Sequence, residues 1–245
     1  MNFTILRFDA IDSTNSEAAR HAKLGADEGL CIIARHQTAG RGRHGRTWVS
    51  EKDAGLYFSI ILRPKLEMRF IPLITLMTGV AVYDALKEFN LKPDIKWVND
   101  ILIGDKKISG ILAETAETPR GLAVVVGVGV NLTSRDFPDE IASAATSIEA
   151  ETGHSVAAND VAQALTHYLG YFYDVLRNEP AEILQAWRAR SSYFSDKTVL
   201  VTLENRTIEG ITDGLEETGA LRVKTPDGQI ERVYAGDVKR LRTQE

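Results

Sequence analysis

The hydrophobic pattern of this chain changes near Ser195, and this change constrains the fold more than any other feature of the sequence. From there on, short runs of alternating apolar and polar residues are separated by turn signals such as Pro226-Asp227-Gly228. Strands this short and evenly spaced are typical of a small antiparallel barrel or meander. We therefore expect two domains, residues 1–195 and residues 196–245. The strands expected in the second domain are residues 197–203, 207–213, 220–225 and 230–234.

The first domain mixes helical and strand patterns. Residues 71–89 carry apolar side chains at helical spacing and predict a long, buried helix, and two more helices are expected between residues 159 and 190. Thr14 and Glu17 have the spacing of a capping box, so we expect Thr14 to cap another helix. The expected strands are residues 4–8, 30–36, 55–62, 95–98, 108–113 and 122–130, and a turn at 104–106 is expected to join two of the last three as a hairpin.

Composition limits the function. The net charge is −5, so binding to nucleic acid through overall charge is disfavoured, and any capacity to bind anions must be local. The single cysteine, Cys31, excludes an intrachain disulfide and a cysteine-cluster metal site, and its apolar surroundings predict a packed strand residue. The N-terminus lacks the pattern of a signal peptide, and the longest apolar run, residues 70–83, is too short to span a bilayer. We expect a cytoplasmic protein that does not associate with membranes.

One segment, residues 35–48, concentrates positive charge. It contains four arginines, two histidines and three glycines, and it contains no acidic residue. Glycines let backbone N–H groups approach a phosphate closely, and arginines neutralise it. The like charges of such a loop repel one another when it is empty, so we expect it to be poorly ordered without a ligand and to be neutralised by a polyanion. A solvated basic loop is the alternative on spacing alone, and the segment is not a Walker A loop, because no Gly-Lys-Ser/Thr ends it.

Two further segments contain polar residues or glycines close to expected strands. In residues 96–100, the pair Asn99-Asp100 is more typical of a turn than of a nucleotide or magnesium site, although a lysine at position 96 on a buried strand would need an anion. In residues 127–131, two glycines imitate half of a dinucleotide fingerprint, but no helix begins after them. We interpret them as small residues packed against a flat ligand.

In order and spacing, these segments resemble the bacterial biotin protein ligases, and the resemblance covers nearly the whole chain. The most specific block, residues 37–46, is similar to the family's glutamine followed by Ala-Gly-Arg-Gly-Arg and then Gly-Arg. Residues 96–100 are similar to Lys-Trp-Pro-Asn-Asp, with Val98 in place of the proline. Residues 107–114 and 127–131 match the remaining blocks.

The resemblance implies a fold and an activity. The fold is α+β, with a catalytic domain like that of biotin and lipoate ligases, in which helices pack on a mixed β-sheet, followed by a small SH3-like β-barrel. The implied enzyme is an ATP-dependent, AMP-forming biotin–[biotin carboxyl-carrier protein] ligase that uses Mg²⁺. It would convert biotin to biotinyl-5'-AMP and transfer the biotin to a lysine of the biotin carboxyl carrier protein of acetyl-CoA carboxylase.

The resemblance also implies roles for individual residues. Lys107 and Arg43 are expected to be catalytic, whereas the metal ligands and the base that deprotonates the acceptor lysine are not identified. Trp48 and Trp97 are expected either to line the pocket or to lie in the core. The residues expected to bind biotin are Ser13, Thr14, Asn15, Gln37, Gly40, Arg41, Gly42, Arg43 and Lys107. The residues expected to bind ATP are Arg41, Arg43, Arg46, Asn99, Asp100 and Asn131.

Two alternatives remain open. A lipoate–protein ligase is the nearest enzymatic alternative, because that family is similar in fold and uses the same two-step logic. A biotin-responsive transcriptional repressor belongs to a different class. We disfavour DNA binding because the first expected strand begins at about Thr4, which leaves no room for an N-terminal winged helix-turn-helix. The sequence does not decide whether the chain forms a homodimer through an exposed strand edge.

Overall fold

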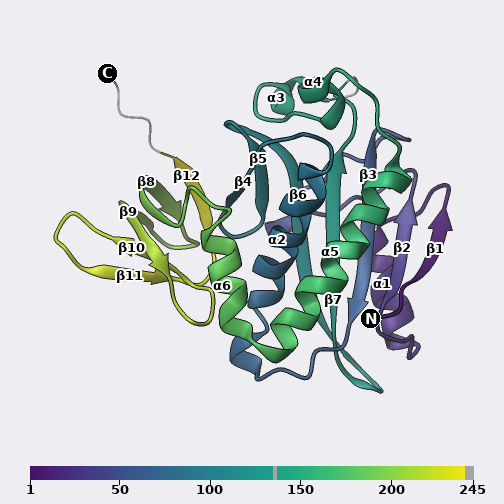
Figure 1. The fold of residues 1–245 in the computed structure, drawn as a ribbon, viewed down its shortest axis with the longest axis horizontal. Helices are drawn as coiled ribbons and strands as arrows, with labels where there is room; N and C mark the ends of the chain where they lie inside the picture. Colours follow the sequence, from purple (N-terminus) through teal and green to yellow (C-terminus); the bar gives the residue numbers. More distant parts are fainter. Residues whose placement is uncertain (135–136, 241–245) are drawn as a thin grey trace.

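A seven-stranded mixed sheet forms the centre of the larger domain in the computed structural model, which describes residues 1–134 and 137–240 (Figure 1). The strand order is β1-β2-β3-β7-β6-β5-β4, in which β1 and β2 are parallel and the other neighbours are antiparallel. The strands are β1 (Thr4–Phe8), β2 (Leu30–Ala34), β3 (Gly55–Leu62), β4 (Pro93–Lys96), β5 (Asp100–Ile103), β6 (Lys106–Thr118) and β7 (Gly121–Asn131).

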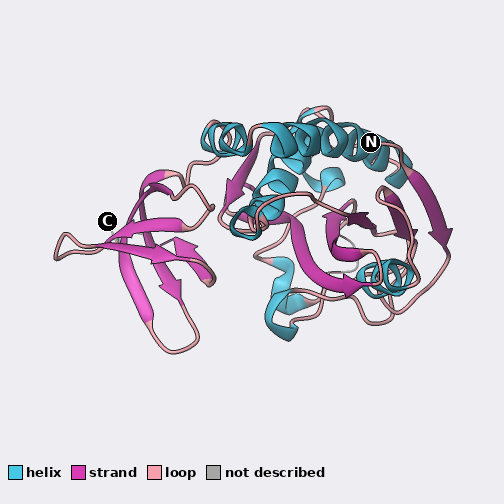
Figure 2. Ribbon diagram, turned by 90° about the horizontal axis from the view of Figure 1, so that it is seen from below, coloured by secondary structure: helices cyan, strands magenta, loops and turns pink. Residues whose placement is uncertain are grey.

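Helices cover both faces of this sheet (Figures 1 and 2). On one face lie α2 (Leu73–Lys87), α5 (Ala158–Asn178) and α6 (Pro180–Arg188), and on the other face lies α1 (Thr14–Lys23). Two short helices that the sequence patterns did not predict, α3 (Asp139–Ala142) and α4 (Ile148–Thr152), follow β7. The predicted α+β class is therefore confirmed.

Alternation along β7 explains where other side chains can approach the sheet closely. Successive side chains of a strand point to opposite faces. Four valines of β7 belong to the core under α2 and α5, whereas Ala123 and Val125 belong to the core under α1. By the same alternation, Gly127 and Gly129 lie on the α1 face beyond that core. Because glycine has no side chain, Asn15 of α1 and the Trp48 ring can pack directly on the sheet at these two positions.

The helical stretch Met68–Lys87, which ends with α2, is long and apolar enough to cross a membrane by length and composition. It is 67% buried inside the domain. Its apolar residues, including Leu76, Val80 and Ala81, belong to the main core cluster. Packing in the core therefore accounts for the hydrophobicity of this helix.

A second, smaller sheet follows the helices (Figure 1). It is antiparallel, with the order β11-β10-β9-β8-β12, and it contains the predicted alternating runs together with a fifth strand that we did not predict. The expected small C-terminal β domain is therefore present, and β11 and β12 lie at the edges of its sheet. The strands are β8 (Ser195–Thr202), β9 (Thr207–Leu215), β10 (Leu221–Lys224), β11 (Ile230–Val233) and β12 (Asp237–Arg240).

The two sheets are linked through Trp97, which is 2% exposed and belongs to the main core cluster. Its indole Nε1 donates a hydrogen bond to the carbonyl oxygen of Gly219 in the C-terminal domain at 3.0 Å. Between Trp97 and Val98 the peptide bond is cis. A buried tryptophan N–H needs a partner, so this hydrogen bond fixes the small domain against the large one.

The strand prediction was wrong around Lys96. We expected a strand at residues 95–98, but β4 ends at Lys96, and a new strand, β5, begins at Asp100. The turn at Gly104-Asp105 therefore joins β5 to β6. The polar pair Asn99-Asp100 concealed the start of β5, because these residue types are more typical of turns than of strands.

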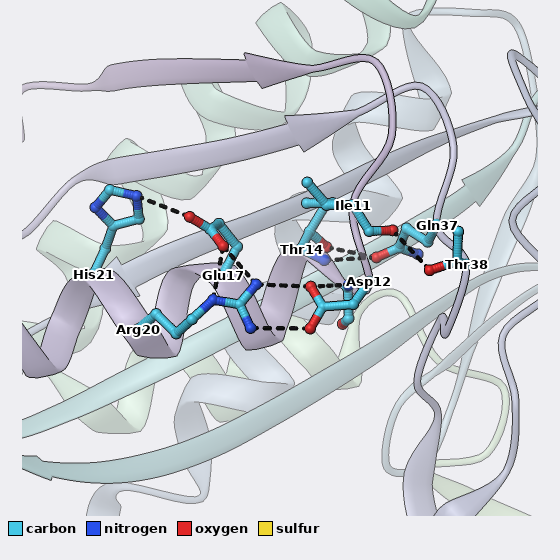
Figure 3. A network of polar contacts seen from close by, with 9 residues as sticks. Ile11, Asp12, Thr14, Glu17, Arg20, His21, Gln37 and Thr38 are labelled. Carbon is cyan, nitrogen blue, oxygen red and sulfur yellow. Dashed lines mark hydrogen bonds and ion pairs between the residues drawn. The ribbon is translucent and has the colours of Figure 1, made fainter.

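The capping-box prediction was also wrong. Ser13 is the N-cap residue of α1, and the backbone N–H of Thr14 donates to Gln37 Oε1 at 2.7 Å. The Glu17 carboxylate instead accepts a hydrogen bond from Arg20, whose Nε lies 2.8 Å from Glu17 Oε2. The other oxygen, Glu17 Oε1, lies 3.2 Å from His21 Nε2 (Figure 3). A side chain 23 residues away thus satisfies the N–H group that a local cap would otherwise satisfy.

Candidate active site

One pocket on the α1 face brings together most of the residues that the sequence indicated. The N-terminus of α1, the segment of residues 37–48, the strands β5, β6 and β7, and Asp237 of the C-terminal domain all contribute to its lining. Gly40 and Asn131 are the two expected ligand-binding residues that do not line it. The expected residues that do line it are Ser13, Thr14, Asn15, Gln37, Arg41, Gly42, Arg43, Arg46, Asn99, Asp100 and Lys107.

We call residues 37–48 the arginine loop; it forms a small hairpin over the pocket. The backbone N–H of Gly42 donates to the carbonyl of Arg46 at 2.7 Å, and that of Trp48 donates to the carbonyl of Gly40 at 3.0 Å. A Cβ atom at Gly40 would lie 2.2 Å from the carbonyl oxygen of Trp48. Gly40 therefore acts by letting the two arms of the hairpin approach each other, not by lining the pocket.

Each arginine of the loop has a partner from a distant part of the chain. Arg41 forms an ion pair with Glu114 at 2.5 Å, Arg46 pairs with Asp237, and Arg43 donates to Asn99 Oδ1 at 3.0 Å. Burial lowers the pKa of Arg43, and the charge of Asp100 opposes that effect. Acidic residues that are remote in sequence thus offset the charge of an acid-free segment. The predicted disorder of the empty loop stays a prediction.

The closed end of the pocket is neutral, buried and rich in hydrogen bonds. Thr14, Asn15 and Gln37 are 4%, 4% and 8% exposed, and Ser59 beneath them is fully buried. The Thr14 hydroxyl lies 3.1 Å from Gln37 Oε1 and 2.8 Å from Ser59 Oγ. Such a site fits a neutral ligand that carries both donors and acceptors, because buried polar groups need partners.

The opposite end of the pocket is charged. Lys107 Nζ lies 2.6 Å from Asp100 Oδ1, and Lys96 Nζ lies 3.1 Å from Asp100 Oδ2. Burial raises the pKa of Asp100, but the two lysines outweigh burial, so the net pKa is below its ordinary value. Asp100 therefore remains ionised and holds two ammonium groups at one place, with Arg43 nearby. This end of the pocket can receive anions.

Trp48 lies between the two ends. A Cβ atom at Gly129 would lie 2.4 Å from the Trp48 ring, and one at Gly110 would lie 2.9 Å from it, so the indole packs directly on the glycines of the sheet. Lys107 Nζ is 5.5 Å from the centroid of the same ring. We expected a flat ligand to pack on the glycines at 127 and 129; the group that the structure places on Gly129 is the flat side chain of Trp48.

Asn131 belongs to a second pocket next to the first. Its Nδ2 donates to the carbonyl of Thr146 at 2.9 Å, so this amide also anchors the segment that follows α3. The second pocket shares four residues with the first, namely Thr47, Trp48, Tyr57 and Lys107, and it is otherwise lined mainly by apolar residues. These residues include Val49, Ala54, Phe137, Ile141, Ala144 and Ala145.

Comparison with known proteins identifies this arrangement. Residues 8–131 match the biotin/lipoate A/B protein ligase family, and residues 194–240 match the biotin protein ligase C terminal domain. The biotin–[acetyl-CoA-carboxylase] ligase of Paracoccus denitrificans is 33% identical over 227 residues, which are 89% of this chain and 93% of that protein. The chain belongs to the biotin protein ligase family. Its sequence blocks therefore predicted the family correctly.

Two further relatives support membership in the family. The bifunctional ligase/repressor BirA of Bacillus subtilis is 35% identical over 243 residues, which are 96% of this chain and 73% of that protein. The structure of the Aquifex aeolicus biotin protein ligase, in complex with biotin and ATP, superimposes with a TM-score of 0.86 at 28% identity. That similarity covers 97% of this chain and 99% of the other.

The sequence patterns did not predict three residues in or next to the pocket. Ser59 lies on a buried strand and looked like an ordinary core position, and Glu114 and Asp237 lie far in sequence from the arginines that they contact. The family blocks gave one usable signal, because Glu114 ends the block of residues 107–114. No pattern in the sequence singled out Asp237.

Proposed function

We propose that this chain activates biotin with ATP to form biotinyl-5'-AMP and transfers the biotin to a lysine of the biotin carboxyl carrier protein of acetyl-CoA carboxylase. One observation carries the proposal: a single pocket joins a neutral, hydrogen-bonding end to a cationic end across Trp48. Biotin has the same division, with a neutral ureido ring at one end and a carboxylate at the other. The family membership of the chain supports the assignment.

The ureido ring fits the closed end. It carries two N–H donors and one carbonyl acceptor, and the side chains of Thr14 and Gln37, which line the pocket, offer a hydroxyl and an amide group for them. Asn15 also lines the pocket, and its amide is held in place by Leu112, Glu114 and Ser59. The dithiolane ring of lipoate has no hydrogen-bond donor, so the buried polar groups favour biotin over lipoate.

The anions of the reaction fit the charged end. The biotin carboxylate attacks the α-phosphorus of ATP, and pyrophosphate leaves. Lys107 and Arg43 would hold the two anions in line and stabilise the charge that develops on the phosphate. In the second pocket, the apolar lining around Phe137 would accept adenine, which places the nucleotide next to Lys107. The acceptor lysine then attacks the acyl carbon, and AMP leaves.

Mg²⁺ would enter this site bound to the phosphates of ATP. Among the described residues, no group of three or more His, Cys, Asp or Glu side chains could hold a metal by itself. A triphosphate-bound Mg²⁺ needs only one or two protein carboxylates. Asp100 and Asn99 line the pocket and would supply oxygen ligands. The ion would neutralise negative charge on the phosphates.

The decisive experiment measures pyrophosphate release with purified protein, ATP, Mg²⁺ and either biotin or lipoate. We expect release that depends on biotin, formation of biotinyl-5'-AMP, and labelling of a carrier domain when it is added. If pyrophosphate is released with lipoate but not with biotin, the protein is a lipoate ligase and the proposal is wrong. Without an adenylate of either acid, the assigned activity would be wrong.

The arginine loop would protect the adenylate from water until the acceptor arrives. Its glycine-containing hairpin covers the pocket, and its arginines reach partners on β6, the β4–β5 turn and the C-terminal domain. Limited proteolysis with and without biotin and ATP tests this lid. We expect cleavage within residues 37–48 to slow when both ligands are present. Equal cleavage in both conditions would contradict a lid.

A further inference from the structure

We infer that Glu114 couples the closed end of the pocket to the arginine loop, so that a ligand bound at Thr14 and Gln37 fixes Arg41 through Glu114. This inference rests on the proposed function, because biotin is the ligand used to test it. Glu114 does not line the pocket, and its role is that of a positioning residue that acts through Arg41 and Asn15.

The carboxylate of Glu114 contacts two partners, one with each oxygen. Glu114 Oε1 lies 2.5 Å from Arg41 Nη2, and Glu114 Oε2 accepts a hydrogen bond from Asn15 Nδ2 at 3.0 Å. Arg41 belongs to the arginine loop, whereas Asn15 belongs to α1 beneath the pocket. One side chain on β6 therefore connects the cover of the pocket with its floor.

From Asn15 a series of close polar contacts continues across the floor, in which the single hydroxyl proton of Ser59 is donated either to Asn15 Oδ1 or to Thr14 Oγ1. Asn15 Oδ1 lies 2.6 Å from Ser59 Oγ, and Gln37 Nε2 donates to Ser50 Oγ at 2.7 Å. Ser50 Oγ in turn donates to the carbonyl oxygen of Trp48 at 3.0 Å. We call this chain of contacts the Glu114 network. In order, it consists of Glu114, Asn15, Ser59, Thr14, Gln37, Ser50 and the Trp48 carbonyl.

The Glu114 network meets the arginine loop at both ends. Glu114 holds Arg41 near the start of the loop, and Ser50 holds the carbonyl of Trp48 at its end. Thr14 and Gln37, which face the pocket, lie in the middle of the network. A ligand that takes up their remaining hydrogen bonds would immobilise both anchors of the loop at once.

The side chain of Asn15 is held in one position by its contacts, so it cannot rotate away when a ligand binds. Its amide binds Leu112 O, Glu114 and Ser59, and a Cβ atom at Gly127 would lie 2.1 Å from its Oδ1. The side chain of Asn15 therefore packs tightly against β7, so a shift of one of its partners is passed on to the others.

The Arg41–Glu114 ion pair is partly exposed, with side chains 45% and 34% exposed, and such pairs add little to folding stability. Its role should therefore be visible in ligand binding.

Glu114→Gln tests the inference, because a glutamine oxygen can still accept from Asn15 but carries no charge for Arg41. The matched control is Glu117→Gln, the same change at an exposed position of the same strand. Hydrogen exchange of residues 37–48 is measured with and without biotin, together with biotin affinity and the melting temperature of each variant. All three proteins should melt alike.

We expect biotin to slow exchange of the loop in the parent and in Glu117→Gln. In Glu114→Gln, the biotin-induced protection and the biotin affinity should both fall by roughly two- to fivefold. Adding Arg41→Gln to Glu114→Gln should cause little additional loss, because both changes break one interaction.

Equal protection in Glu114→Gln and the parent would overturn the inference, and so would a loss in the double variant that equals the sum of the losses in Glu114→Gln and in Arg41→Gln alone. If the parent itself binds no biotin, the proposed function fails along with the inference. A parent that binds biotin while Glu114→Gln behaves identically overturns the inference alone.

Discussion

Asp237 of the C-terminal domain forms an ion pair with Arg46 of the arginine loop, and both side chains line the pocket. The neighbouring carbonyl of Gly236 accepts a weak hydrogen bond from Arg43 at 3.4 Å. The second domain thus places a carboxylate among the cations that we propose for phosphate binding. An anionic ligand and Asp237 therefore compete for Arg46.

Asp237→Asn should strengthen ATP binding. The exposed pair contributes little on its own, whereas a carboxylate near the phosphates repels them, so the KM for ATP should fall by about two- to fivefold. The kinetics of pyrophosphate release check this. Glu209→Gln, an exposed charge change on β9 of the same domain, is the control and should leave the KM unchanged. A higher KM in Asp237→Asn would show instead that Asp237 assists nucleotide binding.

Lys107→Ala should lower the rate of adenylate formation by about 100- to 1,000-fold, the usual effect of removing one electrostatic group from an enclosed site. The fold should survive, because Asp100 keeps Lys96 as a partner. Lys106→Ala removes the same charge from the adjacent, exposed position and serves as the control. Single-turnover formation of biotinyl-5'-AMP separates the two variants, and near-parental rates in Lys107→Ala would refute its catalytic role.

Gly129→Ala should displace Trp48 from the sheet. The added methyl group would lie 2.4 Å from the indole ring, and overpacking of this kind costs about 1–3 kcal/mol. We expect a loss of activity of roughly tenfold or more with a native circular dichroism spectrum. Gly170→Ala on α5 is the control, because its methyl group would meet Phe3 at an ordinary 3.4 Å. Unchanged activity in Gly129→Ala would show that the position of Trp48 is unimportant.

Cys31 should be unreactive in the folded protein. The residue is fully buried on β2, and burial raises the pKa of its thiol to about 12. Because the thiolate is the nucleophile, iodoacetamide at pH 8 should not modify the native chain, whereas the denatured chain should take up one equivalent. Mass spectrometry distinguishes the two outcomes. Rapid labelling of the native protein would mean that β2 opens readily.

Local patterns in the sequence predicted the parts of the fold that depend on local chemistry. The apolar period of residues 71–89 corresponds to α2, and the alternating runs after Ser195 correspond to four of the five strands of the small sheet. Likewise, the blocks that contain Arg41 and Lys107 converge on one pocket. These elements could be predicted because each needs only its own residues to define it.

Other features depend on partners that are distant in sequence. Thr14 has the spacing of an N-cap residue, but Gln37, 23 residues away, binds its N–H; the contacts of Asn15 with Glu114 and Ser59 likewise have no local signal in the sequence. Similarly, the ion pairs of the arginine loop with Glu114 and Asp237 join residues that are far apart in sequence. A single sequence shows which groups are present but not which of them satisfy one another.

The position of Trp48 against Gly129 makes its intrinsic fluorescence a probe of the pocket. Of the three tryptophans, Trp97 and Trp187 are 2% and 0% exposed in the core, and Trp48 alone borders both pockets. Changes in intrinsic fluorescence on titration with biotin will therefore originate chiefly from Trp48. Occupancy of the pocket can be followed in unlabelled protein, in real time.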